Sequence, residues 1–301
     1  TILFNKLKNI KPKRDYISQD GLRIKNIEDK YLCEQVRKIV HEKKWDYEII
    51  ENINIKNLGC RKSVSEGINW FFENEEKGII LEDDCIPSNS FFMFSEKMLE
   101  KYENDKDIYL ISGSNFQKNK IIGDGDYYFS KYAHCWGWST WRRAWKKYDK
   151  DLQFWQNWKQ TNHWKNLHKN SFERKYWTKI FNKVENNKID SWAYVWLASV
   201  WYNKGLTIIP NLNLIQNIGF NVNATSTVSS NTELNMTKEQ NMNSSIKNPS
   251  KKIVDIPADD FVFKNHFNGI YNFWPWRLLY IIKILCNEPG TFWLKLKKNL
   301  K

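Results

Sequence analysis

The sequence predicts an α/β fold in which a doubly wound, mostly parallel sheet is flanked by helices. Three observations lead to this prediction: short apolar strands alternate with amphipathic helices up to about residue 113, the connections are short, and carboxylates follow two of the strands. In open sheets of this kind, ligands bind beyond the carboxyl ends of the strands. We therefore expect a ligand site beside those carboxylates.

The elements of this alternation can be placed in order along the chain. Apolar residues have helical spacing from Ile2 to Ile10 and Lys11-Pro12 ends the pattern, so the chain is expected to begin inside a helix. Strand-like runs and apolar stripes at helical spacing predict the remaining elements. We expect strands at 15–18, 47–52, 78–81 and 108–112, and helices through 32–40, 60–72 and 91–102.

The composition excludes a disordered chain. Of the 301 residues, 41% are hydrophobic, and 17 Phe, 16 Trp and 14 Tyr supply enough apolar surface for a large core. The formal net charge of +13 favours an anionic partner such as a phosphate, an anionic lipid or a nucleic acid. Only the charge favours nucleic acid, so we expect no nucleic-acid partner.

The cysteines and the apolar runs predict a cytoplasmic chain. Because no Cys-x-x-Cys pair is present, we expect reduced, mostly buried thiols rather than a zinc site or disulfides. No run approaches the ~20 apolar residues of a membrane span, and the first residues lack the apolar core of a signal peptide. The five cysteines are Cys33, Cys60, Cys85, Cys135 and Cys286.

Tryptophan becomes dense after Gly113, where the regular alternation stops. Aromatic faces can stack on sugar rings, but large aromatic side chains more often pack in a core. We expect most of these residues in the core and one or two at a carbohydrate site. The tryptophans are Trp136, Trp138, Trp141, Trp145, Trp155, Trp158, Trp164, Trp177, Trp192, Trp196 and Trp201.

Three carboxylates, Glu82-Asp83-Asp84, directly follow the predicted strand 78–81. Adjacent like charges repel one another unless a cation joins them. One or two carboxylates together with phosphate oxygens are a typical shell for Mg²⁺ or Mn²⁺ bound with a nucleotide diphosphate. The alternative is a solvated acidic turn without a ligand.

A second candidate site lies upstream, where Asn57-Leu58-Gly59 leads into a helix with Arg61 and Lys62 in its first turn. The free N–H groups and the positive dipole end of a helix favour anions, so a diphosphate would fit here. The alternative is an ordinary turn before a helix. Asp20, at the end of its own strand, could accept from a base N–H or a ribose hydroxyl, or could cap the helix that follows.

Several segments, taken in order, resemble nucleotide-sugar glycosyltransferases of the GT-A fold. The resemblance is to a bacterial family of nucleotide-diphospho-sugar transferases and, more distantly, to the Golgi N-acetylglucosaminyltransferase I. It covers roughly residues 1–260. The segments are Ser18-Gln19-Asp20-Gly21, Ile80 to Pro87 with Phe91-Phe92, Ser112-Gly113-Ser114-Asn115, Tyr128-Phe129-Ser130, Trp136 to Trp141 and Asn217-Ile218-Gly219-Phe220.

This resemblance implies one GT-A domain with a nucleotide-sugar-binding half at 1–113, an acceptor-side half at 114–260 and a basic aromatic tail at 261–301. It also implies inverting transfer of a sugar from a nucleotide diphosphate donor, expected to be UDP-linked, to a saccharide or lipid-linked acceptor.

The resemblance also assigns roles to individual residues. Asp84 would ligate Mn²⁺ or Mg²⁺, Glu82 and Asp83 would face the donor ribose and sugar, and Asp20 would meet the base. Asn57 and Lys62 are the further residues that we expect at the donor.

The sequence departs from the family pattern at three places. The family's first strand, which precedes the opening helix, is absent, so we expect a fragment that lacks part of the nucleotide pocket. Ala193 stands where relatives can carry the catalytic base, and Ser226 stands near the position of a family histidine. These departures motivate an alternative function, a noncatalytic relative that binds carbohydrate or nucleotide sugar.

Asp190, three residues before Ala193, is the candidate base that would deprotonate the acceptor hydroxyl. Its alternative role is a helix N-cap. Asp149 and Asp151 are weaker candidates on a predicted turn, and His134 is expected to be structural because it lies in an aromatic stretch.

The tail has two interpretations. Residues 273–286 are apolar apart from Arg277 and Lys283, and the polar Asn287 follows them. The chain then ends in a basic segment with Lys295, Lys297, Lys298 and Lys301. Interfacial tryptophans and lysines beside an anionic leaflet favour peripheral attachment to the cytoplasmic membrane face. The alternative is a helix that docks on the chain's own core.

Overall fold

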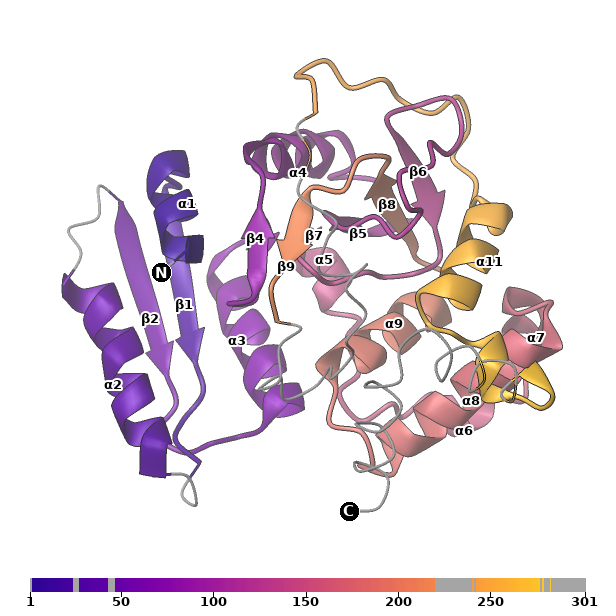
Figure 1. The fold of residues 1–301 in the computed structure, drawn as a ribbon, viewed down its shortest axis with the longest axis horizontal. Coiled ribbons are helices and arrows are strands. Elements are labelled where there is room, and N and C mark those ends of the chain that lie inside the picture. Colours follow the sequence, from indigo (N-terminus) through magenta and orange to yellow (C-terminus); the bar gives the residue numbers. More distant parts are fainter. Residues whose placement is uncertain are drawn as a thin grey trace.

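The computed structural model describes residues 2–23, 27–42, 47–219, 240, 242–276, 278 and 282. Its centre is a five-stranded sheet with the strand order β3-β7-β5-β8-β6 (Figure 1). Both sequence halves, 1–113 and 114–260, contribute strands to it. The strands are β3 (Lys77–Ile80), β5 (Ile108–Ser112), β6 (Tyr127–Ser130), β7 (Trp138–Trp141) and β8 (Leu206–Pro210).

Two smaller sheets lie beside the central one. Strands β1 (Arg14–Gln19) and β2 (Glu48–Ile53) pair in parallel, and β4 (Cys85–Pro87) pairs antiparallel with β9 (Ile215–Asn217). The predicted α/β fold with flanking helices is confirmed. Among the described residues the pairing is mixed, since only β1–β2 and β5–β8 are parallel and the other four pairs are antiparallel.

The reason for the mixed pairing lies after Gly113. There β6 and β7 enter the sheet in a part of the chain where the alternation of strand and helix has stopped, so no crossover helix brings them in parallel. The prediction of a mostly parallel sheet extended the pattern of the first 113 residues too far.

The helices follow the predicted order. Ser88, Asn170 and Ser191 accept hydrogen bonds from first-turn N–H groups and so cap α4, α8 and α9. The helices are α1 (Ile2–Ile10), α2 (Ile27–Glu42), α3 (Cys60–Asn74), α4 (Asn89–Lys101), α5 (Arg142–Trp145), α6 (Trp155–Trp158), α7 (Asn162–Leu167), α8 (Ser171–Glu185), α9 (Trp192–Tyr202) and α11 (Ile256–Asn265), with a 3₁₀ turn at Ile270–Asn272.

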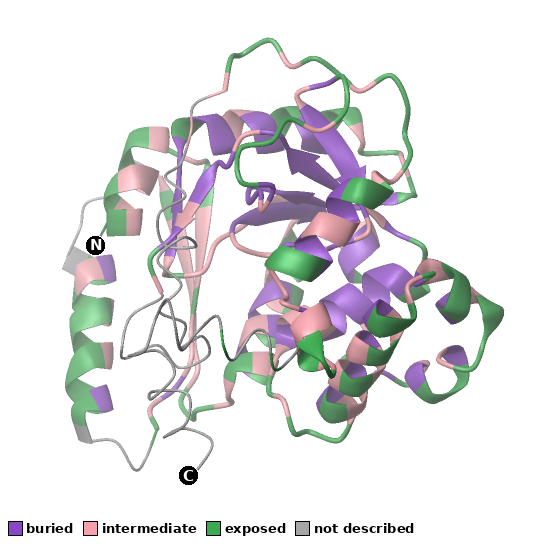
Figure 2. Ribbon diagram, turned by 45° about the vertical axis from the view of Figure 1, so that its right-hand side comes forward, coloured by how far each residue is buried: buried purple, intermediate pink, exposed green. Residues whose placement is uncertain are grey.

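Helices cover both faces of the central sheet. Phe91 and Phe94 of α4 pack on one face with Ile108 and Ile111, while α3, α5 and α9 pack on the other with Tyr109 and Leu110. A register shift between Ile108 and Leu110 explains why these β5 side chains do not alternate strictly. The result is a three-layer arrangement with the strands buried between helices (Figure 2).

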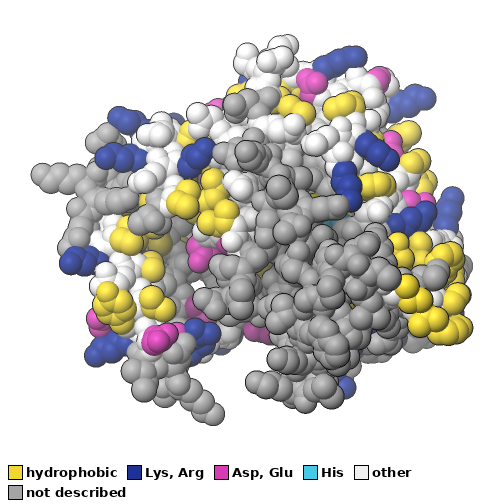
Figure 3. Space-filling view, viewed as in Figure 1, with side chains coloured by type: hydrophobic (Ala, Val, Ile, Leu, Met, Phe, Trp, Pro, Cys, Tyr) yellow, Lys and Arg dark blue, Asp and Glu magenta, His cyan; other side chains and the backbone are white. Residues whose placement is uncertain are grey.

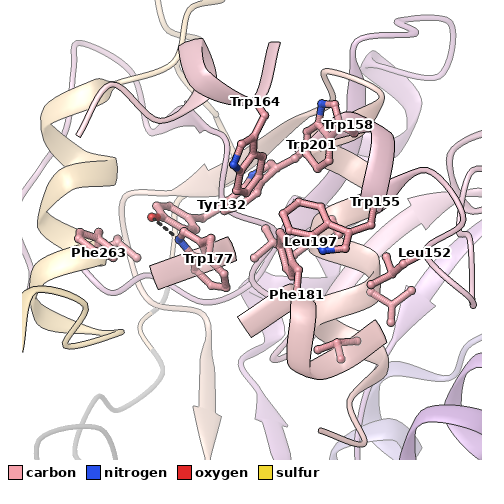
Figure 4. Close-up of a cluster of buried hydrophobic side chains, with 14 residues drawn as sticks. Tyr132, Leu152, Trp155, Trp158, Trp164, Trp177, Phe181, Leu197, Trp201 and Phe263 are labelled. Atoms are coloured by element: carbon pink, nitrogen blue, oxygen red, sulfur yellow. Dashed lines mark hydrogen bonds between the residues drawn. The ribbon is translucent and has the colours of Figure 1, made fainter. Parts of the chain in front are cut away.

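A third cluster holds α6, α7, α8 and α9 together. Trp155, Trp164, Trp177 and Trp201 are fully buried there, and Trp177 Nε1 donates to Tyr132 Oη at 3.4 Å (Figure 4). Ten of the eleven tryptophans named from the sequence are buried, and only Trp136 is half-buried. The expectation that most of them form core is confirmed.

Two expectations about burial are wrong. In α2, Leu32 and Val36 were predicted to face the core, yet they are 54% and 44% exposed, and the helix is largely exposed in Figure 2. Among the described cysteines, all free, only Cys85 is buried, whereas Cys60 is exposed. Both predictions assumed that an apolar side chain finds a core, but α2 covers only the small β1–β2 sheet.

On the face that Figure 3 draws, Lys and Arg side chains of the described residues are scattered around the outline. Within the described part of the chain, no helix combines the length and the apolar character needed to cross a membrane.

Candidate functional site

The acidic triplet forms the turn between β3 and β4, as the sequence predicts. Glu82 and Asp84 are half-buried and Asp83 is exposed. The turn is closed by a hydrogen bond from the Cys85 N–H to the Glu82 carbonyl oxygen at 3.0 Å. Of the three carboxylates, only Asp83 is therefore freely solvated, as the alternative of an acidic turn without a ligand expects.

Asp84 is enclosed by the end of β9. The Ile218 N–H donates to the Asp84 carbonyl oxygen at 2.8 Å, and Cys85 Sγ donates to Asp84 Oδ1 at 3.4 Å. A Cβ at Gly219 would collide with Asp84 Oδ2, so only glycine lets the backbone approach this carboxylate so closely. The segment Asn217 to Gly219, to which the sequence analysis gave no role, thus forms a wall of the site.

The two half-buried carboxyls resist ionisation. Burial, followed by the charges of Asp84 and Asp83, raises the pKa of Glu82 to about 7. Burial is also the largest effect on Asp84 and raises its pKa, although the hydrogen bond from Cys85 opposes the shift. Neither carboxyl is bonded to a cation among the described residues.

Asp20 joins the ends of β1 and β2. Its Oδ1 accepts from the N–H groups of Gly21 and Leu58 at 2.8 and 2.9 Å, and its Oδ2 accepts from Asn57 Nδ2 at 2.9 Å and the Gly59 N–H at 3.2 Å. These four donors occupy the acceptor sites of a carboxylate. The structure thus brings the predicted residues Asp20 and Asn57 together, but they bind each other, and Asp20 does not cap α2.

Asp190 caps α3 from a distant part of the chain. Its Oδ2 accepts from the Cys60 N–H and its Oδ1 from the Arg61 N–H, both at 3.1 Å. Gly59 precedes the helix with φ 81° and offers no side-chain cap, so Asp190 supplies the missing acceptor. A Cβ at Gly59 would lie 3.0 Å from Asp190 Oδ2.

This contact changes the interpretation of two predicted features. The first N–H groups of α3, expected to receive a diphosphate, already hold a carboxylate. The capping alternative for Asp190 is realised, but on α3, while Ser191 caps α9. Asp190 is exposed and a carboxylate has acceptor sites beyond these two, so its assignment as the base stays a prediction.

The two cations of the first turn of α3 point to protein partners. Arg61 donates to the carbonyl oxygens of Val184, at 3.1 Å, and of Lys150. Lys62 is exposed and lies 3.7 Å from Glu66 one turn on. Of the two, only Lys62 keeps an exposed ammonium near the helix start.

Nearby carboxylates affect the pKa of the Cys60 thiol. Desolvation raises its pKa to about 11, and the charges of Glu82, Asp190 and Asp20 add to the shift. The pKa of Cys135 is also raised, by burial first and then by Glu82 among other groups. Acidic side chains from three separate segments therefore act on the Cys60 thiol, a convergence that no sequence spacing indicated.

The remaining candidates lie elsewhere. Ala193 lies in the first turn of α9 and packs against the cluster of α3, α5 and α9, and Asp149 accepts from the Asp151 and Gln153 N–H groups as a turn cap. Asp151 is exposed. His134 is buried, and burial and then His266 lower its pKa, so it is neutral as a structural histidine. Ser226 lies outside the described residues.

The site has the ligand chemistry for a hard cation but no complete cage. Among the described residues, no group of three or more His, Cys, Asp and Glu side chains is arranged to hold a metal ion. Mg²⁺ keeps several waters and is typically bound by one or two carboxylates plus substrate phosphates. The carboxylate oxygens of Asp84 and Glu82 are ligands of the kind that such an incomplete shell uses.

Comparison with known proteins adds no family. No protein-family model matches the chain, and no curated protein is significantly similar to it.

We predict that Asp190→Ala destabilises the fold by about 0.5–2 kcal/mol, because the first N–H groups of α3 lose their acceptor. Urea denaturation measures the change in the free energy of unfolding. Asp151→Ala, at an exposed aspartate, is the matched control and should leave stability within about 0.5 kcal/mol of the wild type. Equal stabilities of the two variants would contradict the capping role.

A second prediction concerns pH. The raised folded pKa of Glu82, about 7 against 4.5, means that its protonated form stabilises the fold below pH 4.5 and that this contribution is lost as pH rises through 7. Glu82→Gln stays neutral, so its stability should exceed that of the wild type above pH 7, by up to about 3 kcal/mol.

The measurement is the free energy of unfolding between pH 5 and 8 with a chelator present. Glu96→Gln, at an exposed glutamate on α4, is the control. If the Glu82→Gln and wild-type curves run parallel across this range, the buried carboxyl does not titrate as described.

Proposed function

We propose that the chain is a metal-dependent glycosyltransferase of the GT-A type. It transfers a sugar, with inversion, from a nucleotide diphosphate donor, expected to be UDP-linked, to a saccharide or lipid-linked acceptor. The observation that carries the proposal is the pair of half-buried carboxyls, Glu82 and Asp84, at the turn after β3. The ordered motifs that resemble this class of enzyme support it.

Each residue has a role in the proposal. Asp84 ligates Mn²⁺ or Mg²⁺, and Glu82 and Asp83 face the donor ribose and sugar. Lys62 is an exposed cation for the diphosphate. Bound there, the metal ion would stabilise the charge of the departing diphosphate.

Two further residues act by holding the loop before α3. Asp20 binds Asn57 and the N–H groups of Leu58 and Gly59, and Asp190 holds the first turn of α3. We therefore assign both as positioning residues in the proposed site.

One observation favours a second candidate function. Ala193 stands at the family's base position, and the nearby Asp190 is engaged by two N–H groups. A noncatalytic relative that binds a nucleotide sugar would need no base. Donor binding without turnover is the result that distinguishes this candidate from the enzyme.

We predict that Asp84→Asn weakens Mn²⁺-dependent binding of UDP by about tenfold or more, because a neutral amide replaces the carboxylate ligand. Isothermal titration with UDP, with and without Mn²⁺, measures the loss. The fold should survive, since burial already disfavours the charged form of this side chain.

Asp151→Asn is the control with the same change at an exposed site. Unchanged Mn²⁺-dependent affinity in Asp84→Asn would remove the metal assignment. If the wild type binds UDP-sugars but shows neither transfer nor donor hydrolysis, the noncatalytic candidate replaces the enzyme.

We also propose that the chain attaches peripherally to the cytoplasmic membrane face, where it would meet a lipid-linked acceptor. Trp274 and Trp276 are 73% and 43% exposed, and Leu278 is 45% exposed. Exposed tryptophans of this kind favour a membrane interface. The basic end of the tail lies outside the described residues.

We predict that the double variant Trp274→Ala/Trp276→Ala loses binding to vesicles of mixed neutral and anionic lipid in co-sedimentation. Wild-type binding should weaken as salt screens the basic charges. Tyr31→Ala, at a 64% exposed aromatic on α2, is the matched control. Absence of wild-type binding, or an equal loss in the control, would reject attachment through the tail.

A further inference from the structure

A strongly basic cavity lies on the α8 side of the molecule, built from other residues than the acidic turn. It has a volume of about 540 Å³ and is lined by α8 together with residues of α7 and the end of α6. Of its eleven lining residues, seven are Lys or Arg and none is Asp or Glu. Such a concentration of one sign raises the local concentration of anionic ligands.

The lysines of α8 form a row. Lys175, Lys179 and Lys183 follow one another at intervals of four residues, so they share a helix face with about 6 Å of rise between neighbours. Like charges at this spacing destabilise a helix. All three are exposed, and none has a carboxylate partner among the residues that the structure describes. By contrast, Lys252 lies 2.8 Å from both Asp105 and Asp107.

Hydrogen bonds tie α8 to the neighbouring segments that line the cavity. Arg174 donates to the His168 carbonyl oxygen at 2.9 Å, and Lys159 Nζ lies 3.4 Å from Asn182 Oδ1. Trp164 at the base of the wall is 1% exposed, locked in the aromatic cluster of α6 to α9. The cavity is therefore built against the aromatic cluster, and the three lysines of α8 that line it are exposed.

The side chains that line the cavity favour one class of anionic ligand over others. Its one aromatic residue, Trp164, is buried, so no ring is available to stack on nucleic-acid bases. The cavity is concave and offers no exposed apolar side chain to insert into a bilayer. Thr178 and Asn186 also line the cavity; the Thr178 hydroxyl and the Asn186 amide donate to the Arg174 and Asn182 carbonyl oxygens, and their own oxygens can accept from sugar hydroxyls.

We propose that this cavity binds an acidic oligosaccharide, a chain of sugars that carries carboxylate, phosphate or sulfate groups. We identify this oligosaccharide with the acceptor of the sugar transfer, an identification that rests on the proposed function. Lys188, at the edge of the cavity, is two residues before Asp190, whose carboxylate holds the start of α3. The lining of the cavity is therefore continuous along the chain with the segment that caps α3.

The test uses a fluorescent sulfated dextran oligosaccharide as probe and measures its affinity by anisotropy. The triple variant Lys175→Glu/Lys179→Glu/Lys183→Glu should bind it about tenfold or more weakly, and wild-type binding should weaken with salt. Uncharged dextran of the same length should bind weakly to both proteins. The three lysines are exposed, so thermal melts should show the variant folded.

The control, Lys106→Glu/Lys146→Glu/Lys147→Glu, changes the net charge by the same amount at exposed lysines outside the cavity. It should bind the probe within about twofold of the wild type. An equal loss in both triple variants would mean that net charge alone attracts the probe, and would overturn the proposal.

Two further probes complete the test. If an oligo-dT strand or anionic lipid vesicles bind more tightly than the oligosaccharide through the same three lysines, the cavity is a nucleic-acid or membrane site instead. Asp84→Asn should bind the sulfated oligosaccharide as the wild type does. If the wild type failed to bind UDP, the proposed glycosyltransferase function would be refuted. Lysine-dependent binding of the oligosaccharide would still support the cavity as an acidic-saccharide site.

Discussion

The arrangement of the site depends on the contact between Asp190 and the first turn of α3. It joins segments 130 positions apart in the sequence. Gly59, which precedes α3, has no side chain to satisfy the free N–H groups of the helix, so a distant carboxylate does so. Helix α3 follows β2 along the chain, and Asp190 lies just before α9. This cap therefore connects the small β1–β2 sheet to the aromatic cluster on the opposite side of the molecule.

The carboxylates of the site divide into two pairs with opposite surroundings. Asp20 and Asp190 together receive six hydrogen bonds from N–H donors of this chain, which fix the loop before α3 and the start of that helix. Glu82 and Asp84 are half-buried, and their pKa values are raised because no comparable set of donors offsets burial. The first pair therefore builds the site, and the second is the pair whose ionisation a bound cation would favour.

Local features could be predicted from the sequence because their signals are local. The periodicity of 108–112 and 91–102, the acidic turn after β3 and the burial of the tryptophans each depend on neighbouring residues. The partners of Asp190 and Asp20, the antiparallel entry of β7 and the exposure of Leu32 depend on which distant segments meet. Contacts between distant segments cannot be predicted from the spacing of residues within one segment. The lysine row at 175, 179 and 183 is visible in the sequence, but its wall from α6 and α7 is not.

The two charged regions make opposite demands on ligands. A diphosphate and an acidic saccharide are both repelled by the carboxylates around Cys60, so in the proposed reaction each needs cations of its own. The donor would find them in the metal ion at Asp84 and in Lys62, and the acceptor in the lysines of α8. The net charge of +13 therefore does not describe one uniform binding surface. In the proposed reaction, the acidic turn would hold the cation, and the row of lysines on α8, which has no carboxylate partner among the described residues, would hold the anionic chain.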